Sequence, residues 1–479
     1  MSYHHSPFLD GSDDGAERWG IGVSLSGGGH RSTLVSLGVL LAIVDVGWNR
    51  FVRSISSVSG GSLASAFVWS RCDYREVSSE EFSAHVRAAI EYVRRGALFG
   101  TRSSKFRVFA LGASFAMLGA ATFAWLHETA SRSSLVLGCG LIIVFFAASW
   151  LVHFRGSILE RNIRDLWFAQ RDCRLAFEGS APHNGMAEEL DNALQDRGQP
   201  TLHLIACTDL ITGDPVYFTQ GAVIADRMAW PLTSIPLACA VRASMTVPVV
   251  VPPVKLSLAN LVHHGSEIGV TRDRKLALVD GGLFNNLGTD WDLTLRDTVR
   301  AADYMVLHPS HSLPAATRFI VDASAESDIG PSRIADFPVI GSIHNALRAI
   351  RVTFRSGLYG RQLSEIYLAD RSTLAVRAGN VDARLEWNLP DDMHLTRRIW
   401  AHVADRTRLT PTTLRALAYD DCILLVAHGY REATAALYSR GAHQVTGNAW
   451  NSWLGDAVGQ VVRNRRDLAR PDFFPTKPL

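Results

Sequence analysis

Short apolar runs alternate with amphipathic segments along the first part of the chain. Residues 20–25 form an apolar run typical of a buried strand, and residues 33–46 carry apolar side chains at helical spacing. Gly47 follows at the position where a glycine commonly ends a helix. Residues 51–58 predict a second strand, and a further helix is expected from near Ser62. Strand, glycine turn and helix, repeated twice, predict an α/β fold.

The later part of the chain resumes this pattern without an internal repeat. Strands are predicted at residues 202–207, 276–279, 304–307 and 319–321. Helices are predicted at residues 159–194, 347–354 and 414–437, the last in one or two pieces. These elements belong with the first ones in a single α/β domain.

Two long runs at residues 108–126 and 135–152 contain no charged residue. Each is close to the roughly 20 residues that cross a bilayer core. Basic residues flank the pair on both sides: Arg102, Lys105, Arg107, Arg155, Arg161 and Arg164. The positive-inside rule then predicts a two-helix transmembrane hairpin, with the catalytic domain and both termini in the cytoplasm. A pair of buried core helices is the alternative interpretation.

The pattern divides the 479 residues into five segments. Residues 1–18 are polar and acidic and predict a flexible tail. A catalytic domain is expected over 19–105 and 156–440, interrupted by the transmembrane hairpin at 106–155, and residues 441–479 form a C-terminal extension. The net charge of +2 gives no reason to expect a nucleic-acid partner. The six cysteines form no metal-ligand pattern, so no metal is expected and they are interpreted as small buried side chains in a reducing compartment.

A glycine-rich segment between the first strand and the first helix is the first candidate for chemistry. Gly27, Gly28 and Gly29, followed by His30 and Arg31, let the backbone approach a ligand and turn N–H groups toward an anion. A phosphate-binding loop and a dinucleotide fingerprint are competing interpretations, but neither consensus is met. The segment alone favours an anion site over a tight turn only moderately.

Two further segments carry a candidate nucleophile and a candidate base. Ser59 follows the second strand and precedes Gly60 and Gly61, as in the sharp strand-to-helix turn that exposes a nucleophilic serine. Ser57 stands where a glycine is usual, and serine is small enough for the site. Asp280 ends the strand predicted at 276–279 and precedes two glycines, where a carboxylate can act as general base. A turn-forming Asp-Gly is the plain alternative.

The three motifs together, in this order, resemble the patatin-like phospholipase family. The match comprises the glycine loop with Arg31, the turn at residues 57–61, and Asp280-Gly281-Gly282. Other similar stretches lie at 207–213, 241–253 and 420–430, and the apolar runs are not part of the common family pattern. The resemblance implies a three-layer α/β fold with a mostly parallel central sheet, here with an inserted helical hairpin.

The same resemblance implies a Ser59–Asp280 dyad, an oxyanion hole built from Gly27, Gly28, Gly29 and Gly60, and no metal or organic cofactor. Arg31 would support the loop or contact a substrate anion, and His30 would contact substrate or solvent. The expected function is a membrane-associated lipid acyl hydrolase acting on phospholipid or another acyl lipid. Two alternatives stay open: a membrane scaffold or sensor on a degenerate hydrolase fold, and an esterase or thioesterase for other acyl substrates.

Overall fold

The computed structural model describes the chain in twelve stretches, which are residues 21–95, 156–168, 201–219, 222–225, 228–231, 235–247, 251–257, 275–289, 317–323, 373–379, 397–439 and 449–464. The expected tail at 1–18, both charge-free runs, the predicted strand at 304–307 and the predicted helix at 347–354 lie outside these residues. Among the described helices, none is both long and apolar enough to cross a membrane.

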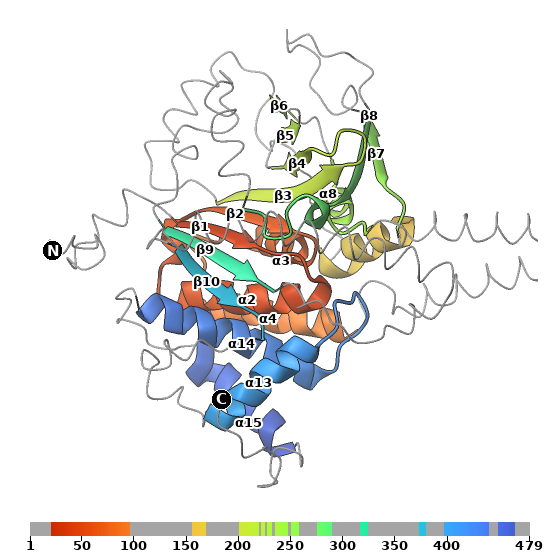
Figure 1. The fold of residues 1–479 in the computed structure, drawn as a ribbon. Coiled ribbons are helices and arrows are strands. Elements are labelled where there is room, and N and C mark those ends of the chain that lie inside the picture. Colours follow the sequence, from red (N-terminus) through yellow and green to blue (C-terminus); the bar gives the residue numbers. More distant parts are fainter. Residues whose placement is uncertain are drawn as a thin grey trace, which may run out of the picture.

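Five parallel strands form the centre of the sheet, in the order β10-β9-β1-β2-β3 (Figure 1). Their bounds are β1 Ile21–Leu25, β2 Val52–Val58, β3 Leu202–Asp209, β9 Thr317–Asp322 and β10 Thr373–Arg377. The apolar runs at 20–25, 51–58, 202–207 and 319–321 all become strands of this group. The predicted α/β fold with a mostly parallel central sheet is therefore confirmed.

Antiparallel strands extend the sheet beyond β3. Strands β4 (Pro215–Phe218), β5 (Ala222–Ala225) and β6 (Met228–Pro231) follow one another outward from β3. Strand β8 (Lys275–Asp280) also pairs with β3 and carries β7 (Val254–Ser257) beside it. The sheet is therefore mixed, and β3 lies where its parallel and antiparallel parts meet.

Helix α2 (Gly29–Asp45) connects β1 to β2 and has every residue buried. It is covered by α14 (Tyr419–Tyr438) and α4 (Ser79–Arg94), which lie below it in Figure 1. The helix ends as predicted at Gly47, whose φ of 69° permits the turn. Gly47 N–H donates to the carbonyl of Val44 and Trp48 N–H to that of Ile43, which is the glycine cap expected at a helix end.

The remaining described helices complete the packing around these elements. Helix α3 (Gly60–Trp69) follows β2 and contacts α2 and β3, and α8 (Leu237–Ser244) contacts α3, β3 and β8. Residues 156–162 are helical and continue into a π-helical turn, η2 (Ile163–Trp167). Helix α13 (Arg397–Leu409) packs on α14, and η8 (Trp450–Leu454) with α15 (Gly455–Asn464) ends the described chain. The predicted helix at 414–437 is one helix that begins later, at Tyr419.

Helices α2 and α14 contact each other through their backbones. A Cβ added at Gly38 would overlap the carbonyl oxygen of Val426, and one added at Gly429 would overlap that of Val35. Only glycine permits so close an approach on both helices. Helix α14 is thereby fixed against α2, the helix that begins at the glycine loop.

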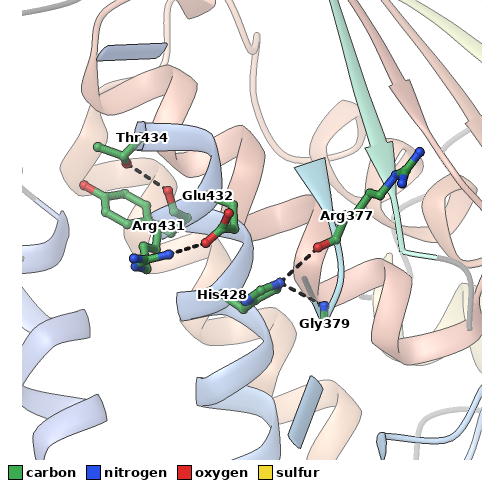
Figure 2. A network of polar contacts seen from close by, with 7 residues as sticks. Arg377, Gly379, His428, Arg431, Glu432 and Thr434 are labelled. Carbon is green, nitrogen blue, oxygen red and sulfur yellow. Dashed lines mark hydrogen bonds and ion pairs between the residues drawn. The ribbon is translucent and has the colours of Figure 1, made fainter. Parts of the chain in front are cut away.

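Helix α14 also holds the end of β10 through a buried histidine (Figure 2). The N–H of Gly379 donates to Nε2 of His428 over 3.0 Å, beside the carbonyl of Arg377. Burial lowers the pKa of His428 to about 4, so the ring is neutral at pH 7 and its nitrogen can accept. On the same helix, Arg431 and Glu432 form a buried ion pair.

The four cysteines within the described residues are free. Cys207, Cys239 and Cys422 are buried, as the sequence predicts, and Cys72 is half-buried. Burial raises the pKa of Cys72, Cys239 and Cys422 to about 12, so these thiols stay protonated and unreactive.

We expect Gly38→Ala to destabilise the fold by about 1–3 kcal/mol, because the new methyl group must push α14 away from α2. The free energy of unfolding from denaturant titration measures this. Gly459→Ala on α15 is the matched control: its nearest neighbour would be 3.7 Å away, and alanine favours a helix by about 0.5–1 kcal/mol. Equal stability of Gly38→Ala and the parent protein would contradict the described helix contact.

Candidate active site

Ser59 occupies the turn between β2 and α3 with an unusual backbone conformation. Its φ is 51° and its ψ is −115°, and within the described residues it is the only residue other than glycine with positive φ. Such a conformation costs on the order of 1–3 kcal/mol and persists only where the surroundings hold it. The residue is 8% exposed, so the turn is largely buried.

Two glycines after Ser59 allow this turn to pack against neighbouring backbone. A Cβ at Gly60 would overlap the carbonyl oxygen of Gly29 in the glycine loop. One at Gly61 would lie 2.5 Å from the carbonyl oxygen of Leu25, at the end of β1. The serine turn and the glycine loop are therefore in direct backbone contact, which is why both positions require glycine.

Ser57, which departs from the usual motif glycine, fits within the sheet. Its side chain is fully buried, and its hydroxyl donates a hydrogen bond of 3.0 Å to the carbonyl of Leu204 on β3. The extra hydroxyl is therefore satisfied and directed toward β3, so it does not distort the turn at Ser59.

Ser244, the last residue of α8, forms a hydrogen bond to the backbone of the serine turn. Its hydroxyl accepts the N–H of Ser59 at 2.9 Å and donates to the carbonyl of Ala206 at 2.6 Å. Because its single proton goes to Ala206, Ser62 must donate the third bond, of 2.8 Å, to Ser244. One hydroxyl thus joins the turn, helix α3 and strand β3.

Strand β8 lies on the same edge of β3 as β2, directly beyond the point where β2 ends. Leu210 N–H donates to Ala277 on β8, whereas Asp209 N–H donates to Asp214 on the opposite side, toward β4. Since β4 occupies that second edge, β2 and β8 must share the first. In register, Val58 faces Ala206, and Asp280 faces Cys207, the next residue along β3.

This register brings Ser59 and Asp280 together. Consecutive Cα atoms lie about 3.8 Å apart, so the partners of Ala206 and Cys207 are near neighbours. Oδ1 of Asp280 accepts the N–H of Gly282 at 2.8 Å, which fixes the carboxylate at the start of η3 (Gly281–Leu283). The side chain of Asp280 is 9% exposed. The positions of Ser59 and Asp280 are therefore adjacent at the carboxyl end of the parallel strands.

The glycine loop lies beside Ser59. A Cβ at Gly27 would be 3.2 Å from that of Ser59, and Gly28 and Gly29 are pressed against Ala323 and Thr413. The N–H of Gly27 already donates to the carbonyl of Asn286 at 2.9 Å. Within the described chain, the N–H groups of Gly28, Gly29 and Gly60 have no protein acceptor, so these three can receive an anion.

His30 and Arg31, which follow the loop, are both buried. Nδ1 of His30 donates to the carbonyl of Arg415 at 2.8 Å, and burial lowers its pKa to about 4. The expectation that His30 contacts solvent is wrong, because helix α2 carries it into the core. Arg31 donates through Nε and Nη2 to the carbonyl of Ala323 and through Nη1 to that of Thr410.

The other buried histidines within the described residues are engaged away from the serine turn. His203 stacks on Trp69, with ring centroids 5.5 Å apart, and shares a 2.8 Å hydrogen bond with Ser65. His428 holds the end of β10, as described above. Burial lowers the pKa of His203 to about 3, so this ring, too, is neutral at pH 7.

Comparison with known protein families identifies the domain that carries these motifs. The family described as patatin-like phospholipase matches residues 23–290, which contain the glycine loop, the serine turn and Asp280. The chain belongs to the patatin-like phospholipase family. This is a family of carboxylic ester hydrolases, and the α/β fold with its mixed central sheet is patatin-like. No curated protein sequence matches the chain significantly.

Several solved structures align with most of the length of this family member at low sequence identity. Human GIVD cytosolic phospholipase A2 aligns with 96% of this chain and 65% of its own, at 13% identity and a TM-score of 0.48. The same human protein in complex with methyl gamma-linolenyl fluorophosphonate aligns at 14% identity, 95% and 61% coverage, and a TM-score of 0.43. VipD from Legionella pneumophila aligns over 86% and 67% of the two chains, at 9% identity and a TM-score of 0.29. The chain thus spans less than two-thirds of the human chains that it matches.

Two residues at this patatin-like site have no distinct signal in the sequence. Ser244 lies in a segment that resembles the family, but nothing in the pattern indicates that its hydroxyl binds the turn at Ser59. Asn286 is one of two adjacent asparagines after Asp280, and only the structure separates their environments. In both cases the contact joins residues far apart along the chain.

We expect Ser244→Ala to lower both stability and activity, because it leaves the N–H of Ser59 and the carbonyl of Ala206 unpaired in the core. The free energy of unfolding should fall by about 1–3 kcal/mol, and hydrolysis of a p-nitrophenyl acyl ester should fall more than the folded fraction does. Ser439→Ala, which removes a hydroxyl bonded only within the end of α14, is the control. Unchanged turnover in Ser244→Ala would show that the turn keeps its shape without the hydrogen bonds of Ser244.

Proposed function

We propose that this patatin-like protein is a serine acyl hydrolase that acts on membrane lipids. Ser59 is the nucleophile and Asp280 its general base. The observation that carries this proposal is the register at β3, where β8 presents Asp280 beside the strained turn that holds Ser59.

The proposed reaction passes through an acyl-enzyme. The Asp280 carboxylate takes the proton of the Ser59 hydroxyl as Oγ attacks the ester carbonyl of the lipid. The tetrahedral intermediate collapses, the alcohol of the lipid leaves with that proton, and the acyl group stays on Ser59. A water molecule, deprotonated by Asp280, then releases the fatty acid and restores Ser59.

The oxyanion donors in this proposal are the N–H groups of Gly28, Gly29 and Gly60. Gly27, which the sequence also suggests, supports the loop instead, because its N–H is bonded to Asn286. Arg31 has a supporting role as well, since its buried guanidinium bonds to carbonyls on both sides of the loop. Oriented donors of this kind cost no reorganisation when charge develops on the carbonyl oxygen.

Exposed apolar residues near the site support a lipid substrate. Leu210 and Ile211, 49% and 64% exposed, lie at the tip of the turn that follows β3, beyond Cys207. Val247 is 45% exposed and follows Thr246, whose carbonyl accepts the N–H of Asp280. Such side chains on the catalytic side of the sheet favour contact with a lipid surface.

We further propose that residues 106–155 anchor the protein in the membrane as an inserted hairpin, with the catalytic domain on the cytoplasmic side. The chain re-enters the catalytic domain directly after the second run. Glu160 forms an ion pair of 2.8 Å with Arg242 on α8, and Trp167 is fully buried against the core. The close packing of 156–168 supports a hairpin that is inserted into one domain running from 19 to 440.

Two other functions are compatible with the fold. A scaffold or sensor would keep the α/β fold but not turn over substrate, and an esterase or thioesterase would act on acyl groups outside the bilayer. The strain retained at Ser59 argues against the scaffold, because an unused turn has no reason to keep that conformation.

We expect Ser59→Ala to abolish hydrolysis of phospholipid and p-nitrophenyl esters, and Asp280→Asn to lower the rate by on the order of 10²–10⁴. Asparagine keeps the oxygen that caps η3, so Asp280→Asn should fold. Steady-state turnover per folded protein measures both effects.

Matched variants separate chemistry from folding. Ser65→Ala removes a buried hydroxyl from α3, and Asp209→Asn keeps the oxygen that accepts from Ala277 and Ile211. Both should keep turnover within a few-fold of the parent. Full activity in folded Ser59→Ala, or a histidine variant as inactive as Ser59→Ala, would refute the dyad.

We expect the full chain to remain in the membrane pellet after carbonate extraction. When residues 106–155 are replaced by a short Gly/Ser linker, the shortened protein should become soluble and still react with a fluorophosphonate probe. Buried core helices would give the opposite result, because their removal would expose an apolar face and cause aggregation without labelling. Recovery of the full chain in the soluble fraction without detergent would also overturn the anchor.

A further inference from the structure

Asn286 lies between the glycine loop and the turn that carries Asp280. Its backbone carbonyl accepts the N–H of Gly27 at 2.9 Å. Its side-chain oxygen occupies the space that a Cβ at Gly27 would fill, and lies 2.5 Å from the place of a Cβ at Gly282. A side chain at either position would overlap the amide of Asn286, so this amide, like the turns, requires glycine at both positions.

These two contacts also locate the amide relative to the proposed dyad. The Cβ position at Gly27 is 3.2 Å from Cβ of Ser59, and the Cβ position at Gly282 is 2.9 Å from Oδ1 of Asp280. Since the amide oxygen adjoins both positions, it lies within about 6 Å of Cβ of Ser59 and of Oδ1 of Asp280. Asn286 thus lies beside both members of the proposed dyad.

The amide nitrogen of Asn286 is buried and has no hydrogen-bond partner among the residues that the structure describes. The adjacent Asn285 differs, because its oxygen accepts from Leu287 N–H at 2.9 Å and its nitrogen donates to Thr289 at 3.0 Å. Buried donors are paired in nearly all native structures, so an unpaired one beside a nucleophile requires an explanation. The explanation is that this N–H group donates to an acceptor atom of the substrate, which is absent until the substrate binds.

A neutral amide suits this position better than a charged donor. A lysine or arginine between Ser59 and Asp280 would form an ion pair with the carboxylate and weaken it as a base. An amide donates without adding charge, and a half-turn about its last side-chain bond exchanges its nitrogen and oxygen. That rotation brings the N–H groups to the side of Gly27 and Ser59 with little change in shape.

We propose that the side-chain amide of Asn286 is an additional oxyanion donor, which binds the carbonyl oxygen of the substrate as that oxygen becomes negative. The inference rests on the proposed function, because it assumes that Ser59 attacks an acyl ester. It adds to the three backbone donors a side chain that belongs to the same turn as the base. Formation of the oxyanion is thereby coupled to the position of Asp280.

The test compares Asn286→Asp and Asn286→Ala with the parent protein on a p-nitrophenyl acyl ester. Aspartate keeps the shape of asparagine but replaces the donor with a negative acceptor. We expect kcat per active site, titrated with a fluorophosphonate, to fall on the order of 10²-fold or more in both variants, with KM changed less than threefold. Thermal unfolding is measured on the same samples.

Asn285→Ser is the matched control, because its hydroxyl can still accept the N–H of Leu287. It should alter the unfolding temperature as much as Asn286→Ala does, while kcat per titrated site stays within threefold. A purely structural role of Asn286 would show the same pattern as Asn285, and such a result would overturn the inference. Failure of the proposed function gives a different result, because the parent protein would then neither react with the fluorophosphonate nor hydrolyse the ester.

Discussion

Backbone contact at the turn between β2 and α3 sets the geometry of the whole site. Gly60 and Gly61 let this turn lie directly on the glycine loop and on the end of β1, and Ser59 is left in a strained conformation between them. Because the turn and the loop touch, the proposed nucleophile Ser59 and the N–H groups of Gly28 and Gly29 cannot move independently. The hydrogen bond from Ser59 N–H to the Ser244 hydroxyl also fixes the turn to the end of α8.

The site is held by segments that are distant in the sequence. Arg31 ties the start of α2 to Ala323 after β9 and to Thr410 after α13, and Gly38 and Gly429 bring α14 onto α2. The family match ends at residue 290, yet these supports come from beyond it. We therefore propose that the working catalytic domain includes α14.

Local patterns in the sequence predict the elements but not their long-range contacts. The strands at β1, β2 and β3, the helix that ends at Gly47, and the serine turn follow from apolar spacing and glycines, which act over a few residues. The approach of β8 to the end of β2 depends on pairing with β3 some 70 residues earlier, for which the sequence carries no local signal. The short strands β4, β5 and β6 are likewise set by their neighbours.

The same limit applies to single side chains. His30 follows three glycines and so suggests an exposed position, but α2 begins one residue earlier and turns the ring into the core. Ser244 and Asn286 differ from many other serines and asparagines only in what lies across from them. A residue's type shows what it can donate or accept, and the packing decides which partner it meets.

The most direct test of this account is to locate the covalent adduct of a fluorophosphonate probe by fragmentation of the labelled peptide. Several serines lie close together here, at positions 54, 56, 57, 59 and 62, so the measurement separates them. The account predicts a single adduct on Ser59, because the strand register places its strained turn beside Asp280. An adduct on Ser57, Ser62 or a serine elsewhere, or no adduct in folded protein, would contradict it.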